Sequence, residues 1–269
     1  PVLDVGFFRQ PAFTGANVVA FCTYFGTFAL FFFVPLYLQL VGSSSGYDLA
    51  LDFIPMAVAL VVASAYTGRW VAAVGPRVPM VTGCVMAAAG LFATDLVVTP
   101  TAGPWQLAWT FALAGAGFGI AIVPVTASVL SVVPAARSGM AASATNTSRE
   151  LGAVAGVSVL GTIVYGKLTV DLSRSLTSIG IPGPIRVLVI RGVTTGQSAK
   201  GLGGGPAIDA LIAKVEKPAY AAFGNGLNVS LWMAGALLLG SAAVAAATMR
   251  RRPQMIDPDA TGSSPAPIR

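Results

Sequence analysis

Two adjacent charged residues, Arg149 and Glu150, lie well inside a stretch rich in small and apolar residues that runs from Gly139 to Gly166. As a helix with a rise of about 1.5 Å per residue, this stretch is long enough to cross a lipid bilayer. A charge that faces lipid costs roughly 2.5 to 3.5 kcal/mol, so we expect both side chains to face protein or a water-filled cavity. Intramembrane ionisable residues typically line the pathway of a substrate or ion. The alternative is structural: the two charges satisfy each other or hold cytoplasmic loops near the start of the helix.

The polar residues of this stretch fall on one side when it is drawn as a helix, because positions three or four apart share a face. One stripe contains Gly139, Ser143, Asn146 and Glu150, the next contains Thr145, Arg149, Gly152 and Gly156, and the roughly opposite face contains Met140, Ala144, Leu151, Val154 and Ser158. We therefore expect a polar interior face and an apolar lipid face. Asn146, Arg149 and Glu150 are the candidates to line a pathway, and the small pair Gly152 and Gly156 favours close helix contact.

Other parts of the chain offer weaker candidates. Asp52 lies about one turn inside a second apolar run and could carry a proton, or it could lie solvated at the headgroup level beside Asp48. Asp95 presents the same choice near the end of a third run. The spacing of Gly115 and Gly119 is a GxxxG pattern, for which helix packing is the expected role.

The composition is that of a polytopic membrane protein. Of the 269 residues, 55% are hydrophobic and 10% are charged, and the mean hydropathy is +0.78, whereas a soluble domain carries about 25% charged residues. The net charge of +6 then indicates basic cytoplasmic loops rather than nucleic-acid binding. The chain has no histidine, and Cys22 and Cys84 lie in apolar runs, so we expect no metal site, no bound cofactor and no histidine base.

The apolar runs predict an all-α protein with about six transmembrane helices. Pro35 should kink or end the first of them. Residues 1–12 read as a cytoplasmic lead-in, residues 167–218 as a long external loop, and residues 250–269 as a disordered cytoplasmic tail. The six predicted spans are about 13–40, 49–68, 78–98, 105–133, 139–166 and 219–249.

The basic residues of the short loops predict the orientation of the chain. One side of the membrane receives Arg9, the loop with Arg69 and Arg77, Arg137 and the cluster 250–252. The turns GSSSGYD and VTPTAGP on the other side contain no lysine or arginine. Cytoplasmic loops carry the excess of Lys and Arg. We therefore expect a multi-pass protein of the cell membrane with both ends in the cytoplasm, and the first residue, Pro1, suggests a piece that begins within a longer protein.

Several stretches together, in their order and spacing, resemble one family. The family is that of fourteen-span drug:proton antiporters, the EmrB/QacA-type members of the major facilitator superfamily. The chain resembles their helices nine, ten, twelve and thirteen in the stretches PVLDVGFFRQPAFTGAN, FFFVPLYLQ with FIPMA, GAGFGIAIVP and TNTSRELGAVAGVSVLGTI. GRWVAAVGPR resembles the degenerate second copy of the superfamily's cytoplasmic loop motif, which places Gly68, Arg69, Gly75 and Arg77 in that motif. It has an alanine, Ala73 or its neighbour, where the motif has Asp.

The resemblance implies a proton-driven exporter of hydrophobic or cationic compounds that works by alternating access. This chain would be its C-terminal half, with the missing N-terminal half and the lipid bilayer as its partners and the proton gradient as its driving force. The first, second, fourth and fifth helices would line the central cavity, which makes Asn17 and Tyr24 candidate lining residues. Two other classes stay open: a non-transporting membrane scaffold or sensor, and a membrane-embedded enzyme, for which the carboxylates are too scattered.

Overall fold

The structure, a computed structural model, describes residues 5–40, 46–99, 103–178 and 206–249. Within these ranges every regular element is helical, and six helices are long and apolar enough to cross a membrane. The predicted all-α, six-helix class is therefore confirmed. The helices are α1 (Pro11–Phe28), α2 (Val34–Leu40), α3 (Gly46–Val74), α4 (Arg77–Val97), α5 (Pro104–Ser131), α6 (Ser138–Ser178) and α8 (Pro206–Thr248), with 3₁₀ turns at Val5–Arg9 and Ala135–Arg137.

The first span neither ends nor breaks at Pro35. Instead, the five residues Ala29–Phe33 form a π-helical turn that joins α1 to α2. Proline removes one backbone donor and pushes against the preceding turn, and a widened turn just before it accommodates both effects. The kink expected at Pro35 is thus a local widening of one continuous helix.

The second and third spans are joined by a much shorter connection than the predicted loop 68–77. Gly68, Arg69 and the residues up to Val74 continue α3, and only Gly75 and Pro76 separate it from α4. Gly75 has φ 83°, a left-handed conformation that favours glycine, and its N–H donates to the carbonyl of Val71 at 2.9 Å. No glycine or proline lies between Arg69 and Gly75, so nothing in this segment stops the helix before Gly75.

The predicted external loop 167–218 is also shorter than expected. α6 continues to Ser178 and α8 already begins at Pro206, so both ends of the predicted loop are helical. Leu168 and Leu172 explain the extension of α6, because they are fully buried, and Leu168 belongs to the same apolar cluster as Phe223 of α8. Residues 179–205 and the predicted tail 250–269 lie outside the described residues.

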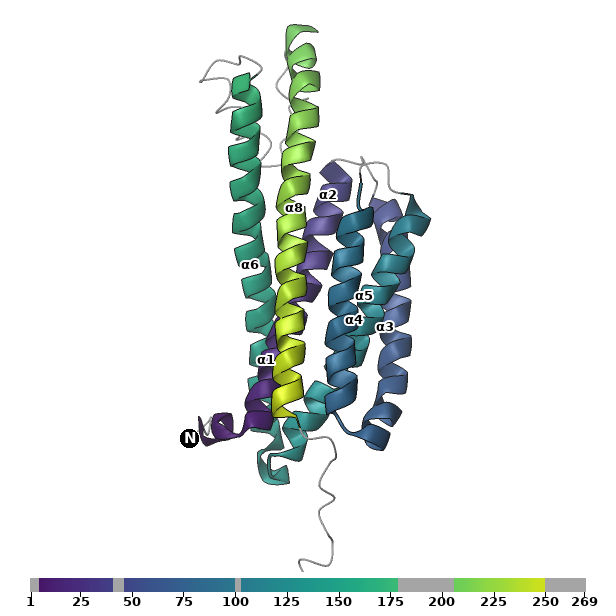
Figure 1. Ribbon diagram of the computed structural model, residues 1–269, viewed down its shortest axis with the longest axis vertical. Helices are drawn as coiled ribbons and strands as arrows, with labels where there is room; N and C mark the ends of the chain where they lie inside the picture. The colour runs from purple at the N-terminus through teal and green to yellow at the C-terminus, as the bar shows by residue number, and fades with distance from the viewer. Residues whose placement is uncertain (1–4, 41–45, 100–102, 179–205, 250–269) are drawn as a thin grey trace, which may run out of the picture.

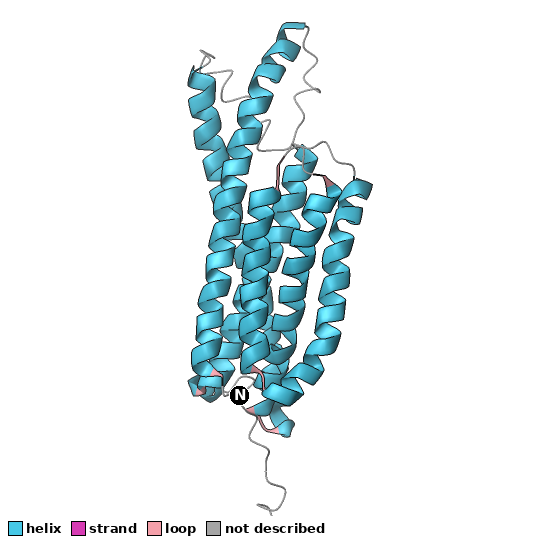
Figure 2. Ribbon diagram, turned by 45° about the vertical axis from the view of Figure 1, so that its right-hand side comes forward, coloured by secondary structure: helices cyan, strands magenta, loops and turns pink. Residues whose placement is uncertain are grey.

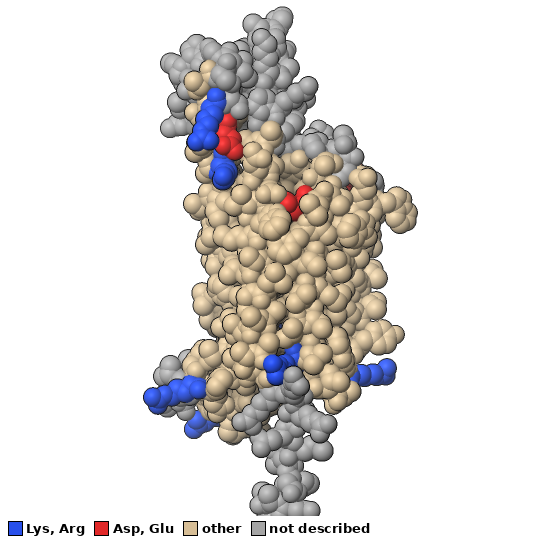
Figure 3. Space-filling model, in the orientation of Figure 1, with Lys and Arg blue, Asp and Glu red and all other residues tan. Residues whose placement is uncertain are grey.

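The six long helices stand side by side, and α6 and α8 extend beyond the others at one end of the bundle (Figures 1 and 2). We call this end the upper end, as it is drawn in Figure 1. The opposite, lower end carries the N-terminal turn Val5–Arg9 and the α3–α4 connection (Figure 1). On the face shown in Figure 3, the charged side chains lie near the two ends and the middle band is uncharged, as a membrane-spanning surface requires.

Helix α5 is the central packing element, and it contacts α4 and α3 most extensively. Glycines allow these contacts to be close. A Cβ added to Gly83 of α4 would stand 2.5 Å from the backbone nitrogen of Ala121, and one added to Gly90 would stand 2.5 Å from the Cα of Ala114. Since membrane helices gain little from the hydrophobic effect, such close van der Waals packing is what joins them.

The glycines singled out in the sequence lie at contacts of the same kind. Gly115 and Gly119 of α5 lie against the backbone of α3 at Met56 and Leu60. On α6, Gly152 lies against Phe21 of α1, and a Cβ at Gly156 would meet the carbonyl oxygen of Phe25 at 2.9 Å. The two GxxxG pairs therefore occupy the α3–α5 and α1–α6 contacts.

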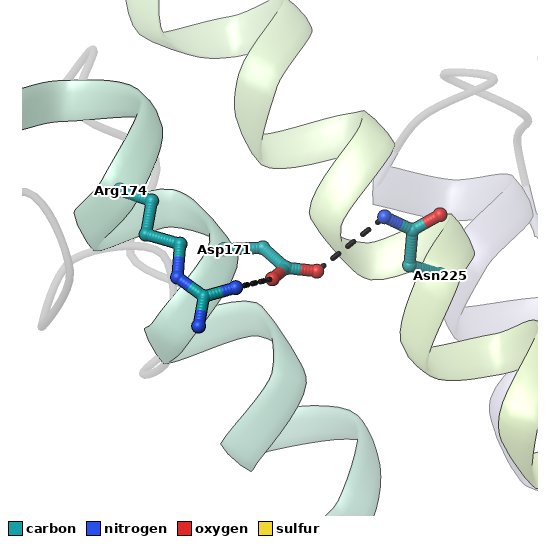
Figure 4. Close-up of polar contacts among 3 residues, drawn as sticks. All are labelled: Asp171, Arg174 and Asn225. Carbon is teal, nitrogen blue, oxygen red and sulfur yellow. Dashed lines mark hydrogen bonds and ion pairs between the residues drawn. The ribbon is translucent and has the colours of Figure 1, made fainter. Parts of the chain in front are cut away.

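The middle of α8 is tied to its neighbours by two asparagines one turn apart. Asn225 donates to Asp171 of α6 at 3.4 Å, and Arg174 lies 3.8 Å from the same carboxylate (Figure 4). Asn228 donates to Asp95 of α4 at 2.6 Å, and the indole of Trp232 donates to the same oxygen at 3.0 Å. One face of α8 thus links α6 to α4 through charge-assisted hydrogen bonds.

We predict that Gly83→Ala destabilises the bundle by about 1 to 3 kcal/mol, because the added methyl group meets backbone atoms that cannot move aside. The measurement is the thermal unfolding midpoint of the detergent-solubilised full-length protein. Gly240→Ala on α8 is the matched control, since nothing lies within 4 Å of its Cβ position. Equal midpoints for the two variants would contradict the close α4–α5 approach.

Candidate functional site

A polar groove of ≈310 Å³ lies between α5 and α6. Most of its lining side chains carry hydrogen-bonding groups, although both helices are long and apolar enough to span a membrane. An open polar groove at that position is where a soluble ligand can be held within a bilayer. The groove is lined by Thr126, Val129 and Leu130 of α5 and by Ala142, Ser143, Thr145, Asn146 and Arg149 of α6.

Arg149 is fixed in the groove by two other helices. Its Nη2 donates to the hydroxyl oxygen of Thr126 on α5 at 3.0 Å, and its guanidinium carbon lies 5.7 Å from the ring centroid of Tyr24 on α1. A cation–π contact contributes about 0.5 to 2 kcal/mol, depending on how far the pair is desolvated. It offsets part of the roughly 2.5 to 3.5 kcal/mol that a membrane-embedded charge costs.

Arg149 lies well inside α6 and not at the start of the helix. Arg149 lies about 16 Å along the helix from Ser138, and Thr126 lies about 8 Å before the end of α5 at Ser131. The guanidinium is therefore inside the length of the bundle, in its lower half. It does not lie at the end of the helix, where it would only hold a loop.

Arg149 and Glu150 do not form an ion pair in the described part of the chain, so the two charges do not satisfy each other. Successive helical residues point about 100° apart. Glu150 is exposed beside Leu151 and Val154, which are 57% and 63% exposed, and it does not line the groove. Asn146, in contrast, lies in the groove together with Arg149.

Asn17 is placed in a helix contact rather than on the groove. Its side chain is 5% exposed, donates to the carbonyl of Phe13 at 2.9 Å, and accepts a hydrogen bond from Ser148 of α6 at 3.0 Å. Of the two lining candidates on the first helix, the structure therefore brings Tyr24 to Arg149 and places Asn17 within the α1–α6 interface.

The remaining predicted residues lie away from this groove. Asp52 is half-buried on the upper part of α3 and is absent from the groove lining. Arg69 is exposed on α3, and Arg77 begins α4. Ala144, predicted on the lipid face, is buried at 8% exposure. A helical drawing gives the relative positions of side chains but not the direction of the neighbouring helix.

Thr126 is the groove residue that the sequence did not indicate. It is one of two threonines in the long apolar helix α5. Threonines in such helices usually bond to their own helix, as Thr110 does to the carbonyl of Leu107 at 2.9 Å. Only the spatial approach of α6 shows that Thr126 accepts from Arg149 instead. No local pattern in the sequence carries this information.

Comparison with known proteins identifies the family of this helix bundle. The family model described as Major Facilitator Superfamily matches residues 3–157. These residues include α1 to α5 and the part of α6 that carries the groove. The chain belongs to the major facilitator superfamily.

Several proteins similar to this chain are named as drug-export or drug-resistance proteins. The chain is 30% identical over 263 residues to the multidrug efflux pump LfrA of Mycolicibacterium smegmatis, an alignment that covers 93% of this chain and 48% of LfrA. It is 26% identical to the multidrug resistance protein Stp of Mycobacterium tuberculosis, over 69% of this chain and 34% of Stp. It is 23% identical to the tetracenomycin C resistance and export protein of Streptomyces glaucescens, over 96% of this chain and 48% of that protein. The chain thus spans about half the length of LfrA and of the tetracenomycin C protein.

We predict that Asn17 and Ser148 stabilise this major facilitator bundle as a pair. In a double-mutant cycle of Asn17→Ala and Ser148→Ala, the coupling free energy should be about 0.5 to 1.5 kcal/mol, because the pair shares one interhelical hydrogen bond. The thermal unfolding midpoints of the four proteins give this value. A cycle in which Thr147→Ala replaces Ser148→Ala should show no coupling, since Thr147 bonds to Ser143 of its own helix. Strict additivity in the first cycle would exclude the bond.

Proposed function

We propose that this chain is the C-terminal half of a proton-driven exporter of small hydrophobic or cationic compounds. The observation that carries this proposal is the polar groove with Arg149, which lies within the membrane-spanning length of a major facilitator bundle. The similarity to LfrA, a protein named as a multidrug efflux pump, supports the export of drugs. The protein would act as a transporter and not as an enzyme, with the proton gradient and no bound cofactor as its source of energy.

Alternating access explains why one side of the bundle is left open. Such a mechanism moves one bundle against another around a central site, so a second bundle must form the opposite wall of the groove. Helix α3 supports this arrangement, because it buries few of its own residues, among them Leu49, Met56 and Thr67. We propose that the N-terminal half of the full-length protein covers that open side, while α4 and α8 face lipid.

The lower end of the bundle is proposed to face the cytoplasm. Four arginines lie in the turns of this end or in the helix ends next to them: Arg9, Arg69, Arg77 and Arg137. Cytoplasmic ends of membrane helices and their loops carry such an excess of basic residues. The upper end, with the projecting α6 and α8, would then face outward across the cell membrane.

The transport proposal is tested with the full-length protein in cells loaded with fluorescent cationic dyes and antibiotics. Export should be energy-dependent and should stop when a protonophore collapses the proton gradient. Export that is absent for the whole panel, or unchanged by the protonophore, would refute a proton-driven exporter.

The orientation is tested by cysteine labelling with an impermeant maleimide on intact cells. Thr177→Cys, exposed near the upper end of α6, should be labelled, and Ala73→Cys, exposed near the lower end of α3, should be labelled only after the cells are opened. The native thiols of Cys22 and Cys84 are buried and give little background. The reverse pattern of labelling would invert the topology.

A further inference from the structure

The guanidinium of Arg149 has hydrogen-bonding capacity that the described chain does not use. An arginine offers five N–H donors in a rigid plane. One contact goes to the hydroxyl of Thr126, and the ring of Tyr24 lies near the guanidinium. No carboxylate of the described residues pairs with it, and no acidic residue lines the groove. Among the described residues, the groove is therefore lined by one cation and by no acidic side chain.

The neighbours of Arg149 in the groove match an anionic oxygen. Asn146 and Ser143 are exposed and contribute an amide N–H₂ and a hydroxyl group, both of which can donate to an oxygen acceptor. Thr126 and Tyr24 together restrict the orientation of the guanidinium. A planar, oriented guanidinium pairs with a carboxylate through two parallel hydrogen bonds, which a hydroxyl or an amine cannot reproduce.

The rest of the lining is apolar and suits a hydrocarbon body. Val129 and Leu130 of α5 and Ala142 of α6 complete the groove wall. A positively charged group placed beside Arg149 would be repelled, and the repulsion is stronger inside a bundle than in water. Any cationic part of a ligand must therefore lie away from Arg149, and Glu150 points to the neighbouring, exposed side of α6.

We propose that the groove binds the carboxylate of an amphiphilic substrate, with Arg149 as the group that recognises it and Thr126 and Tyr24 as positioning residues. This inference rests on the proposed export function and narrows it. The preferred compounds of this site are hydrophobic acids and zwitterions, and purely cationic compounds are the poorer ligands at this position.

The test uses two dyes that differ in one carboxylate, rhodamine B and its ethyl ester. Binding of each dye to purified full-length protein in lipid nanodiscs is measured by fluorescence anisotropy. Arg149→Gln should weaken the binding of rhodamine B by about tenfold to a hundredfold, the loss expected for hydrogen bonds to a charged group. Binding of the ester should change by less than about twofold, since the ester has no carboxylate to pair with Arg149.

Three further variants separate recognition from structure. Arg149→Lys keeps the charge but loses the planar pair of donors, so its loss for rhodamine B should be intermediate. Thr126→Val keeps the charge and removes its positioning contact, which should also reduce the preference for rhodamine B over the ester. Lys167→Gln is the control, because it removes an exposed cation on the same side of α6, about five turns further along, and should leave both dyes unaffected.

The outcomes distinguish this inference from the proposed transport. Equal weakening of both dyes by Arg149→Gln would show that the arginine supports the groove without recognising the carboxylate, and it would overturn the inference, as would unchanged rhodamine B binding. If rhodamine B binding depends on Arg149 but no compound is exported, the carboxylate site stands and the transport proposal fails. If the protein exports cationic dyes but never binds rhodamine B, transport stands and the carboxylate site is refuted.

Discussion

A bilayer offers no water to polar groups, so each polar side chain in these helices must find its partner within the protein. Most of them bond back to their own helix. Thr67 donates to the carbonyl of Ala63 at 2.6 Å and Thr94 to that of Gly90 at 2.8 Å, one turn earlier in each case. Such bonds within one helix do not determine which helix packs beside it. The few polar groups that reach across to another helix therefore carry most of the specific information in the fold.

Those exceptions mark two levels of the bundle. In the lower half, Ser148 bonds to Asn17 and the next residue, Arg149, bonds to Thr126, so one turn of α6 is tied to both α1 and α5. In the upper half, α8 reaches Asp95 and Asp171 on its two neighbours. Between these levels the contacts are made by glycines and apolar side chains, which hold helices together without fixing a hydrogen-bonding register. The groove thus lies at the level of the interhelical hydrogen bonds of α6. Its two wall helices, α5 and α6, are packed closely against other helices through glycines.

The class of the fold could be predicted from composition and apolar run length alone, because a span of a given thickness needs a helix of a given length. The helix ends at Val74 and Ser178 could not, since each lies beyond a segment whose charges resemble a loop. The free-energy cost of a charge in the membrane singles out Arg149 and Glu150 as candidates. It does not tell which of the two lines the groove. A helical drawing ranks the faces of α6 without saying where α1 and α5 stand, so the separation of Arg149 from Glu150 and the role of Thr126 required the three-dimensional arrangement.

Helices α6 and α8 are longer than a bilayer is thick. Each runs for about 60 Å, twice the roughly 30 Å of hydrocarbon that a bilayer provides, and both exceed the other helices at the same end of the bundle. One part of each helix therefore contacts lipid, and the other part extends into water. A protein bound to the water-exposed end of α6 would therefore act on the same continuous helix that holds Arg149.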